Sequence, residues 1–251
     1  MKIGLLTASG NADDPVPAHL LEVVGPDTEL VNFPVRLQTF AYSPAEFLIQ
    51  QVNFVESGLR AAAAGCDRIV YVSVADYGIE ALRSLVEVPV IGAGETTYAA
   101  LSASGTDFSI VTVWPKSTNF VHDRLTHQHN ADQLRVNIHN ISRETVISDA
   151  GRPDDFISRM QDGEKGTFDA IMAACQAVAE RDGASTVVLG CTCMSQLAAR
   201  IRAEAPLPVI DPFAAAIRHA EKDDFSPAAA PTVRGRPEAA KTLQAMIRAI
   251  A

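Results

Sequence analysis

Residues 187–194 read Val-Val-Leu-Gly-Cys-Thr-Cys-Met, and this stretch decides the fold of the chain. Its apolar first half predicts a buried strand that ends at Gly190, and its second half predicts the start of a helix. Cys191 therefore lies at a strand-to-helix junction, where peptide N–H groups stabilise a thiolate and can hold an anionic substrate beside it. The stretch predicts a reactive thiol at the end of a strand.

An earlier segment repeats this pattern. Residues 65–73 (Gly-Cys-Asp-Arg-Ile-Val-Tyr-Val-Ser) align without a gap with residues 183–191 (Gly-Ala-Ser-Thr-Val-Val-Leu-Gly-Cys). The alignment places Ser73 where the second copy has Cys191. Two further pairs of segments fit the same repeat, 2–7 with 107–112 and 87–92 with 206–211. The period lies far above that of solenoid repeats, so it predicts two similar domains that face each other across a cleft.

Apolar, β-rich runs alternate with helical patterns along the chain. Continuous apolar strands joined by helices are typical of parallel sheets that are covered on both faces. The predicted strands are 2–7, 28–33, 68–73, 88–91, 108–113, 135–141, 186–190 and 209–210, and the strongest helical patterns are 44–65 and 167–182. We therefore predict an α/β fold with two similar parallel-sheet domains related by pseudo-twofold symmetry and a site in the cleft between them.

The order of the repeated segments also predicts the domain limits. We expect residues 1–98 together with 211–251 to form the first domain, and residues 99–210 to form the second. Two segments rich in Gly, Asp and Pro, 10–17 and 147–155, are predicted to be loops that could cover a site.

Composition narrows the class of protein. The chain has 251 residues, of which 47% are apolar and 20% charged, and this is ample for a packed core. The formal net charge is −9 with no cluster of Lys and Arg, which argues against nucleic acid and anionic membranes as partners but not against a small anionic substrate. No apolar run approaches the ~18 residues that span a bilayer. The oligomeric state is open in the sequence, with a homodimer as the base-rate expectation.

The four cysteines are too sparse for a disulfide scaffold, so we expect a reduced, cytoplasmic protein. Cys191 and Cys193 form a C-x-C pair with no further His or Cys at ligand spacing, which makes a metal or redox site the minor interpretation. Cys193 is instead expected to pack under the helix start, and Cys175 to lie in the core. Cys66 has no evident role.

Polar residues lie at the predicted carboxyl ends of the strands, where open parallel sheets bind their ligands. The candidate catalytic residues are Cys191 and Ser73. The candidate substrate-binding residues are Thr7, Ser9, Asn11, Val74, Thr112, Ser117 and Thr192. Glu95, Trp114, Lys116 and Asp211 follow strands in the same way.

Each candidate also has a structural interpretation. A buried cysteine often acts as a small hydrophobe, and Ser and Thr are most often caps and turn residues. The position of Cys191 after Gly190 and its pairing with a polar residue in the other copy favour a functional role. Ser73 is either a small residue that fits a strand end or a hydroxyl that binds a carboxylate or enolate oxygen. It would be a poor base, because no His or Lys adjoins it in sequence to activate it.

Several stretches resemble the aspartate/glutamate racemase superfamily, and most closely its hydantoin racemase branch. Residues 71–82 are similar to the first-cysteine segment of that branch, and Leu189-Gly-Cys-Thr-Cys-Met194 is similar to its second-cysteine segment. The segments between and after them, 89–95, 108–117 and 209–211, also look like the corresponding family segments. The similarity spans residues 65–220.

The resemblance implies a cofactor-independent enzyme with no metal. In the family, two cysteines flank the acidic carbon of the substrate: one thiolate removes the proton, and the opposite thiol returns one on the other face. Cys191 corresponds to one of these groups. The other falls on Ser73, so this chain departs from the family pattern.

We therefore predict a racemase or isomerase that acts at the acidic carbon of a small carboxylate or cyclic amide, such as an amino acid or a hydantoin, with Cys191 as the acid/base. The missing cysteine keeps a single-cysteine decarboxylase of a malonate-type substrate, or a maleate-type isomerase, open as alternatives. A non-catalytic small-molecule-binding protein with two lobes is a third.

Overall fold

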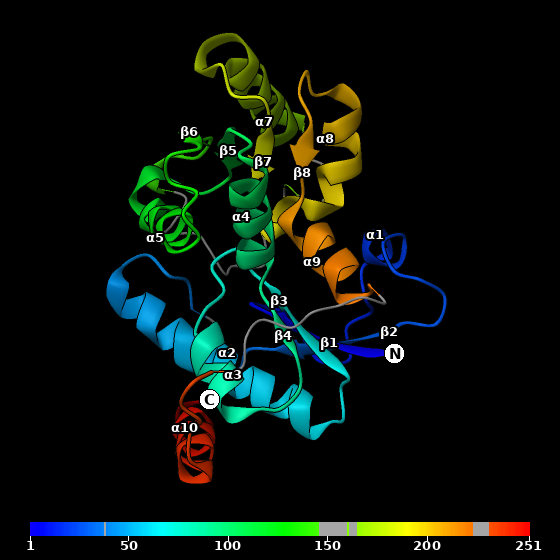
Figure 1. The fold of residues 1–251 in the computed structure, drawn as a ribbon, viewed down its shortest axis with the longest axis vertical. Coiled ribbons are helices and arrows are strands. Elements are labelled where there is room, and N and C mark those ends of the chain that lie inside the picture. Colours follow the sequence, from blue (N-terminus) through cyan, green and yellow to red (C-terminus); the bar gives the residue numbers. More distant parts are fainter. Residues whose placement is uncertain (38, 146–159, 161–164, 223–230) are drawn as a thin grey trace. The chain divides into compact units, whose positions relative to one another are not determined.

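A computed structural model describes residues 1–37, 39–145, 160, 165–222 and 231–251 (Figure 1). The chain divides into two compact units. Unit 1 comprises Met1–Ala93 and Ala216–Ala251, and unit 2 comprises Gly94–Ala215. The predicted loop at 147–155 lies outside the described residues.

Unit 1 contains a four-stranded parallel sheet with the strand order β2-β1-β3-β4. Its strands are β1 (Lys2–Thr7), β2 (Glu29–Pro34), β3 (Arg68–Val72) and β4 (Val90–Ile91). The helices are α1 (Ala18–Leu21), α2 (Pro44–Ala63), α3 (Ile79–Leu85) and α10 (Pro237–Ile250), with α9 (Pro212–Ala220) running from unit 2 into unit 1.

Helix α2 illustrates how the sequence builds this unit. Ser43 precedes Pro44 as the N-cap, and its Oγ accepts the N–H of Ala45 at 3.2 Å. The helix buries the apolar side chains of Phe47, Phe54 and Leu59. Helix α10 packs against α2 (Figure 1).

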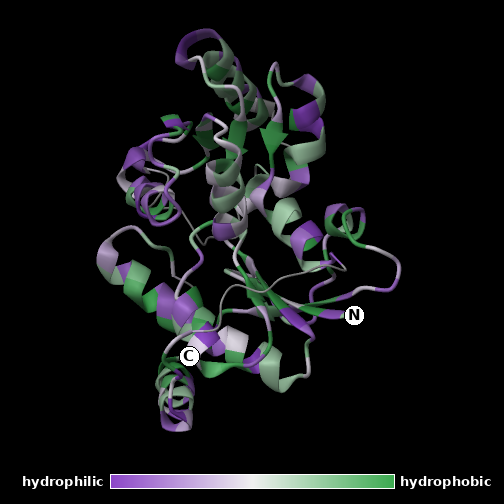
Figure 2. Cartoon of the chain, in the orientation of Figure 1, coloured by the Kyte–Doolittle hydropathy of each residue, from purple (hydrophilic) through white to green (hydrophobic). Residues whose placement is uncertain are grey.

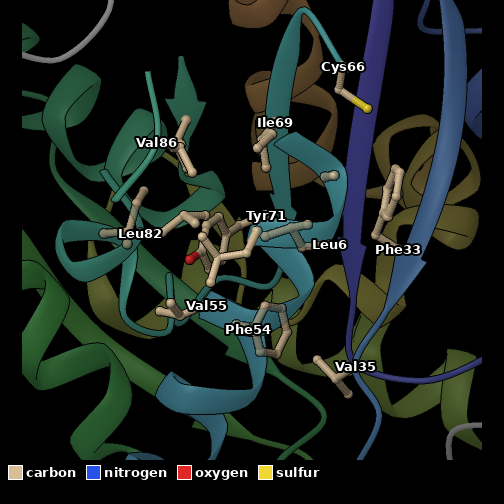
Figure 3. Close-up of a cluster of buried hydrophobic side chains, with 14 residues drawn as sticks. Leu6, Phe33, Val35, Phe54, Val55, Cys66, Ile69, Tyr71, Leu82 and Val86 are labelled. Atoms are coloured by element: carbon tan, nitrogen blue, oxygen red, sulfur yellow. The ribbon is translucent and has the colours of Figure 1, made fainter. Parts of the chain in front are cut away.

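The core of unit 1 is an apolar cluster on β1, β2, β3 and the helices α2 and α3 (Figure 3). Phe54 stacks on Tyr71 with their ring centroids 5.5 Å apart. Tyr71 is fully buried, and Figure 3 shows its ring among Val55 and Leu82. Its hydroxyl has no hydrogen-bond partner among the described residues. Among the described residues, nothing replaces the hydration that this hydroxyl loses on burial.

Unit 2 contains a second four-stranded parallel sheet, with the order β6-β5-β7-β8. Its strands are β5 (Phe108–Thr112), β6 (Arg135–Asn140), β7 (Val187–Leu189) and β8 (Val209–Ile210). The helices are α4 (Ala93–Ser104), α5 (Phe120–Gln128), α7 (Lys165–Ala177) and α8 (Ala198–Glu204). Shorter turns are η1 (Lys116–Thr118), the π-helical η3 (Val178–Asp182) and η4 (Thr192–Leu197).

A polar cluster ties η3 to the sheet of unit 2. The carboxylate of Asp182 accepts hydrogen bonds from Ser109 Oγ at 2.6 Å and Asn137 Nδ2 at 3.2 Å, and it lies 2.7 Å from His139 Nε2. Burial raises the pKa of Asp182, but these hydrogen bonds outweigh it, so its pKa lies below the ordinary value of 3.8. The cluster fixes the end of the helix that leads into β7.

The predicted α/β fold is confirmed. All eight predicted strands are present, with ends within two residues of those expected. Figure 2 shows mainly hydrophobic strands and helices that carry both hydrophobic and hydrophilic positions. Within the described part of the chain, no helix is long and apolar enough to cross a membrane.

Candidate active site

The third strand of unit 1 delivers Ser73 to the carboxyl end of its sheet. Strand β3 ends at Val72, and the Oγ of Ser73 accepts the N–H of Ala75 at 3.2 Å. Val74 is buried. Asp76 follows with a positive φ of 46° and is also buried, at 2% exposure. A left-handed, buried acid is uncommon, and such residues concentrate at functional sites.

The third strand of unit 2 delivers Cys191 in the same way. Strand β7 ends at Leu189, and Cys191 is the N-cap of η4. Its Sγ accepts the N–H of Cys193 at 3.2 Å, and its carbonyl oxygen accepts the N–H of Met194 at 3.0 Å. Ser73 and Cys191 therefore hold their side-chain atoms alike, each against the peptide N–H two residues on.

Gly190 allows the strand end of unit 2 to lie close to its neighbour β5. A Cβ atom at this position would lie 2.6 Å from Thr112 Cβ and 2.8 Å from Ile110 Cγ2. Such distances are far shorter than van der Waals contact, so no side chain fits there. The glycine before Cys191 is thus required by packing within unit 2.

The register of the two sheets makes Thr7 and Thr112 equivalent. Thr7 pairs with Val72, the residue before Ser73. In unit 2, Val111 pairs with Leu189, so Thr112 comes level with the residue before Cys191. Their carbonyl oxygens even accept corresponding N–H groups, from Val35 at 2.9 Å and from Ile141 at 3.0 Å. The repeat in the sequence is therefore a repeat in structure.

Each unit also buries an aspartate near its strand ends, Asp76 in unit 1 and Asp211 in unit 2, and the two follow different strands. In unit 2, Asp211 follows β8, and its Oδ1 accepts Ser195 Oγ at 2.7 Å and the N–H of Phe213 at 3.1 Å. In unit 1 the corresponding position is Gly92. A Cβ there would lie 2.5 Å from Cγ of Asp76, so the Asp76 carboxyl group fills the space of the missing side chain.

Asp76 and Ser195 were not among the predicted site residues. A signal for Asp76 was present in the repeat, because Gly92 aligns with Asp211 and a carboxylate is thereby missing from one copy. Ser195 ties η4, which begins just after Cys191, to Asp211 and so to the end of β8. Its sequence context contains no comparable signal.

The state of the cysteines differs from the expectation. Cys191 and Cys193 are joined in a disulfide, whereas the sequence predicted a free thiol at Cys191 and separate packing for Cys193. The two residues are two apart in sequence at the start of η4, and their Cα atoms lie 5.2 Å apart. Both also pack against the core of unit 2.

The other predicted binding residues have varied surroundings. Thr112 is fully buried, and its Oγ1 accepts the N–H of Trp114 at 3.3 Å. Ser9 is exposed, as is Asn11, whose amide N–H and side chain both bind Asp14. Ser117 donates its Oγ–H to Glu144 at 2.6 Å. Thr192 is half-buried at the start of η4, and Thr7 is half-buried at the end of β1.

Unit 2 also has a surface groove beside the end of β6. It runs between β6 and α7 and is lined by Lys116, His139, Arg143 and Arg181, among others. Cys191 does not line it. In the ranges that the structure describes, no three His, Cys, Asp or Glu side chains gather as a metal site.

The chain belongs to the Asp/Glu/Hydantoin racemase family, whose model matches residues 31–220. A hydantoin racemase from Paenarthrobacter aurescens is 28% identical over 155 residues, which is 62% of this chain and 60% of that protein. The chain thus aligns with about three fifths of the length of this relative.

Two solved structures share the fold. Allantoin racemase from Pseudomonas fluorescens has a TM-score of 0.75 at 20% identity, over 94% of this chain and 98% of that one. Allantoin racemase from Klebsiella pneumoniae has a TM-score of 0.72 at 24% identity, over 88% of this chain and 86% of that one.

Proposed function

We propose that this chain is a cofactor-independent, racemase-type enzyme that exchanges the proton on the acidic carbon of a hydantoin-like cyclic amide. Three observations support the proposal: the family, the hydantoin racemase relative, and the equivalent placement of Ser73 and Cys191 at their strand ends. The last of these carries it, because the family reaction needs one group at each of these positions.

In the proposed reaction, reduced Cys191 is the acid/base. Its thiolate, stabilised by the N–H of Cys193, takes the proton from the carbon next to the ring carbonyl. The electron pair left on that carbon delocalises onto the carbonyl oxygen as an enolate. We propose that Ser73 donates its hydroxyl proton in a hydrogen bond to this oxygen. The Cys191 thiol then returns a proton to the carbon.

The asymmetry of the two residues has a stereochemical consequence. After the Cys191 S–H has exchanged its hydrogen with solvent water, Cys191 returns a solvent hydrogen on the face from which the first one left, and this exchanges hydrogen without inverting the carbon. Inversion needs a proton on the opposite face, where an unassisted serine is a weak donor and a weak base. We therefore expect exchange to be faster than inversion, unlike a site with two cysteines.

Solvent deuterium exchange tests the proposal. Protein reduced with dithiothreitol would be incubated in D2O with each enantiomer of a 5-monosubstituted hydantoin, and deuterium incorporation and optical rotation would be followed together. Faster incorporation than loss of rotation supports the one-sided mechanism. Equal rates would contradict the role of Ser73, and no incorporation with any hydantoin would contradict the substrate class.

A second candidate function is a decarboxylase of a malonate-type substrate. It is favoured by the single cysteine, because protonation of an enolate after loss of CO2 needs only one donor and proceeds on one face. Release of CO2 from aryl-substituted malonates by the reduced protein, in the absence of exchange on hydantoins, would select this function over the first.

A further inference from the structure

The disulfide of unit 2 removes the thiol that the proposed reaction uses. It joins Cys191 to Cys193, whose Cα atoms lie 5.2 Å apart, inside the usual range for disulfides. The corresponding position in unit 1 is Ala75, so the repeat contains this pair in one copy only. A sulfur bonded to another sulfur has no proton to give and no thiolate charge to accept one. The oxidised chain is therefore an inactive form of the proposed enzyme.

We propose that Cys193 is a resolving thiol, which converts peroxide-oxidised Cys191 into a disulfide that a dithiol can reopen. Peroxide would then switch the enzyme off reversibly, without permanent damage to Cys191. The loss and return of activity rest on the proposed function, whereas formation of the disulfide does not.

The chemistry balances in two steps. The Cys191 thiolate attacks one oxygen of hydrogen peroxide, so that an S–O bond forms, the O–O bond breaks and hydroxide leaves to become water. The Cys193 thiol then attacks the sulfur of this sulfenic acid: the S–S bond forms, the S–O bond breaks and a second water leaves. Two thiols have lost two electrons, and peroxide has gained them. A dithiol such as dithiothreitol reverses the result by two thiol–disulfide exchanges.

The surroundings of Cys191 favour it as the sulfur that reacts first. It is half-buried, and the N–H of Cys193 points at its Sγ, which stabilises a thiolate. The two cysteines outside this pair, Cys66 and Cys175, are much less accessible. Cys175 is fully buried, and burial raises its pKa to about 11. Cys66 is 3% exposed, and burial raises its pKa as well.

The position of Cys193 favours the second step over further oxidation. A sulfenic acid is rescued when a thiol reaches it before more peroxide does, and Cys193 lies on the same tight turn as Cys191. Since the closure involves residues two apart, it needs little rearrangement of η4. The pair therefore has the arrangement of a reactive thiol with its resolving partner.

Peptide mapping tests the disulfide directly. Trypsin releases Cys191 and Cys193 together in residues 182–200, with Cys175 in residues 166–181 and Cys66 in residues 61–68. Reduced full-length protein would be treated with hydrogen peroxide, alkylated with iodoacetamide and digested. We expect peptide 182–200 to be two hydrogens lighter and unalkylated, while the other two cysteine peptides are unchanged. Recovery of peptide 182–200 with both cysteines alkylated, or with Cys191 carrying added oxygen, would overturn the proposal.

Variants test the resolving role through activity. Wild type, Cys193→Ser and the buried-cysteine control Cys175→Ser would each be inactivated with peroxide and then treated with dithiothreitol, and the recovered fraction compared with each variant's own starting activity. We expect wild type and Cys175→Ser to recover most of it, and Cys193→Ser to recover about a tenth or less, because its sulfenic acid proceeds to sulfinic acid. Equal recovery by Cys193→Ser would overturn the proposal.

The two arms separate this proposal from the proposed function. If no substrate is found, peptide mapping still decides whether the disulfide forms. If deuterium exchange is intact in Cys191→Ala, the proposed function fails while the disulfide result stands.

Discussion

The ends of β3 and β7 are the same structure with different chemistry. Each lies third in its sheet, each follows the same register, and each ends in a side-chain atom that accepts the N–H two residues on. Unit 1 places a hydroxyl there, that of Ser73. Unit 2 places Cys191 there and adds a second cysteine to the same turn. The backbone repeat therefore sets where each side chain lies, and the difference between the oxygen of Ser73 and the sulfur of Cys191 sets its reactivity.

The buried carboxylates of the two units show the opposite relation, because the same chemical group comes from different backbone positions. Unit 1 lacks the acid at the end of its last strand, but Asp76 reaches the equivalent space from the turn after Ser73. Unit 2 keeps Asp211, which binds Ser195 in the turn after Cys191. Both units thus have a carboxyl group in this place, but it is supplied from a different turn in each. A carboxyl group beside the strand ends is thus common to both units.

The largest expected effect on stability comes from adding a side chain at Gly190. Gly190→Ala would force Cβ into Thr112 and Ile110, and we expect it to lower the free energy of unfolding by about 3 kcal/mol. Urea denaturation of the reduced protein measures this change.

Gly166→Ala is the matched control in the same unit. Gly166 lies exposed in α7, and a Cβ there meets no atom within 4 Å. We expect it to leave stability unchanged or to raise it by up to about 1 kcal/mol, because alanine is the better helix former. Equal effects of the two substitutions would show that the close packing of β5 and β7 is not what requires a glycine before Cys191.

The second prediction concerns acid sensitivity, which we assign to unit 2. Burial lowers the pKa of His122 from its ordinary 6.5 to about 4, and its Nδ1 lies 3.1 Å from the hydroxyl of buried Tyr98. As the pH falls below 6.5, the unfolded chain binds a proton that the folded chain refuses, so stability falls until about pH 4. Between pH 7 and pH 5 this amounts to about 2 kcal/mol.

Urea denaturation at the two pH values tests the assignment. We expect His122→Gln to lose this part of the pH dependence, while His127→Gln, on the exposed side of the same helix, keeps it. An unchanged dependence in His122→Gln would place the acid sensitivity elsewhere.

The sequence predicted the strands and the repeat of this fold, but not the contacts at the strand ends. Continuous apolar runs such as 187–189 made the buried strands predictable, and the match of 65–73 with 183–191 made the repeat predictable. The Cys191–Cys193 bond was not, because it depends on how tightly the turn after β7 closes. Nor was the path of Asp76, which depends on a left-handed residue and on the space above Gly92. Local patterns identify strands, while contacts between side chains at their ends need the folded backbone.

The third prediction concerns a variant in which unit 1 carries a thiol at the position equivalent to Cys191. Ser73→Cys would place a thiol on the N–H of Ala75 in the arrangement that Cys191 has with Cys193. We expect the ratio of inversion to deuterium exchange on a 5-substituted hydantoin to rise by about tenfold or more, because both faces then meet a competent acid/base. Ser73→Ala, which supplies no proton, is the control. An unchanged ratio of inversion to exchange in Ser73→Cys would show that residue 73 does not take part in the reaction.

The smallest effect should come from Tyr71, which aligns with Leu189 of unit 2. Its buried hydroxyl finds no hydrogen-bond partner in the described part of the chain. We expect Tyr71→Phe to raise the free energy of unfolding by about 1 kcal/mol, because the ring keeps its stacking on Phe54 while the unpaired polar atom is removed. A loss of stability in urea denaturation would indicate that the hydroxyl is paired.

The central claim is that Cys191, and not its counterpart Ser73, exchanges the proton. The most direct measurement is deuterium incorporation from D2O into the hydantoin that reduced wild type exchanges, compared for Cys191→Ala and Ser73→Ala. The account predicts a fall of about 10³-fold or more for Cys191→Ala and a smaller fall, about tenfold, for Ser73→Ala, which loses one hydrogen bond to the enolate. Incorporation by Cys191→Ala at the wild-type rate would contradict it.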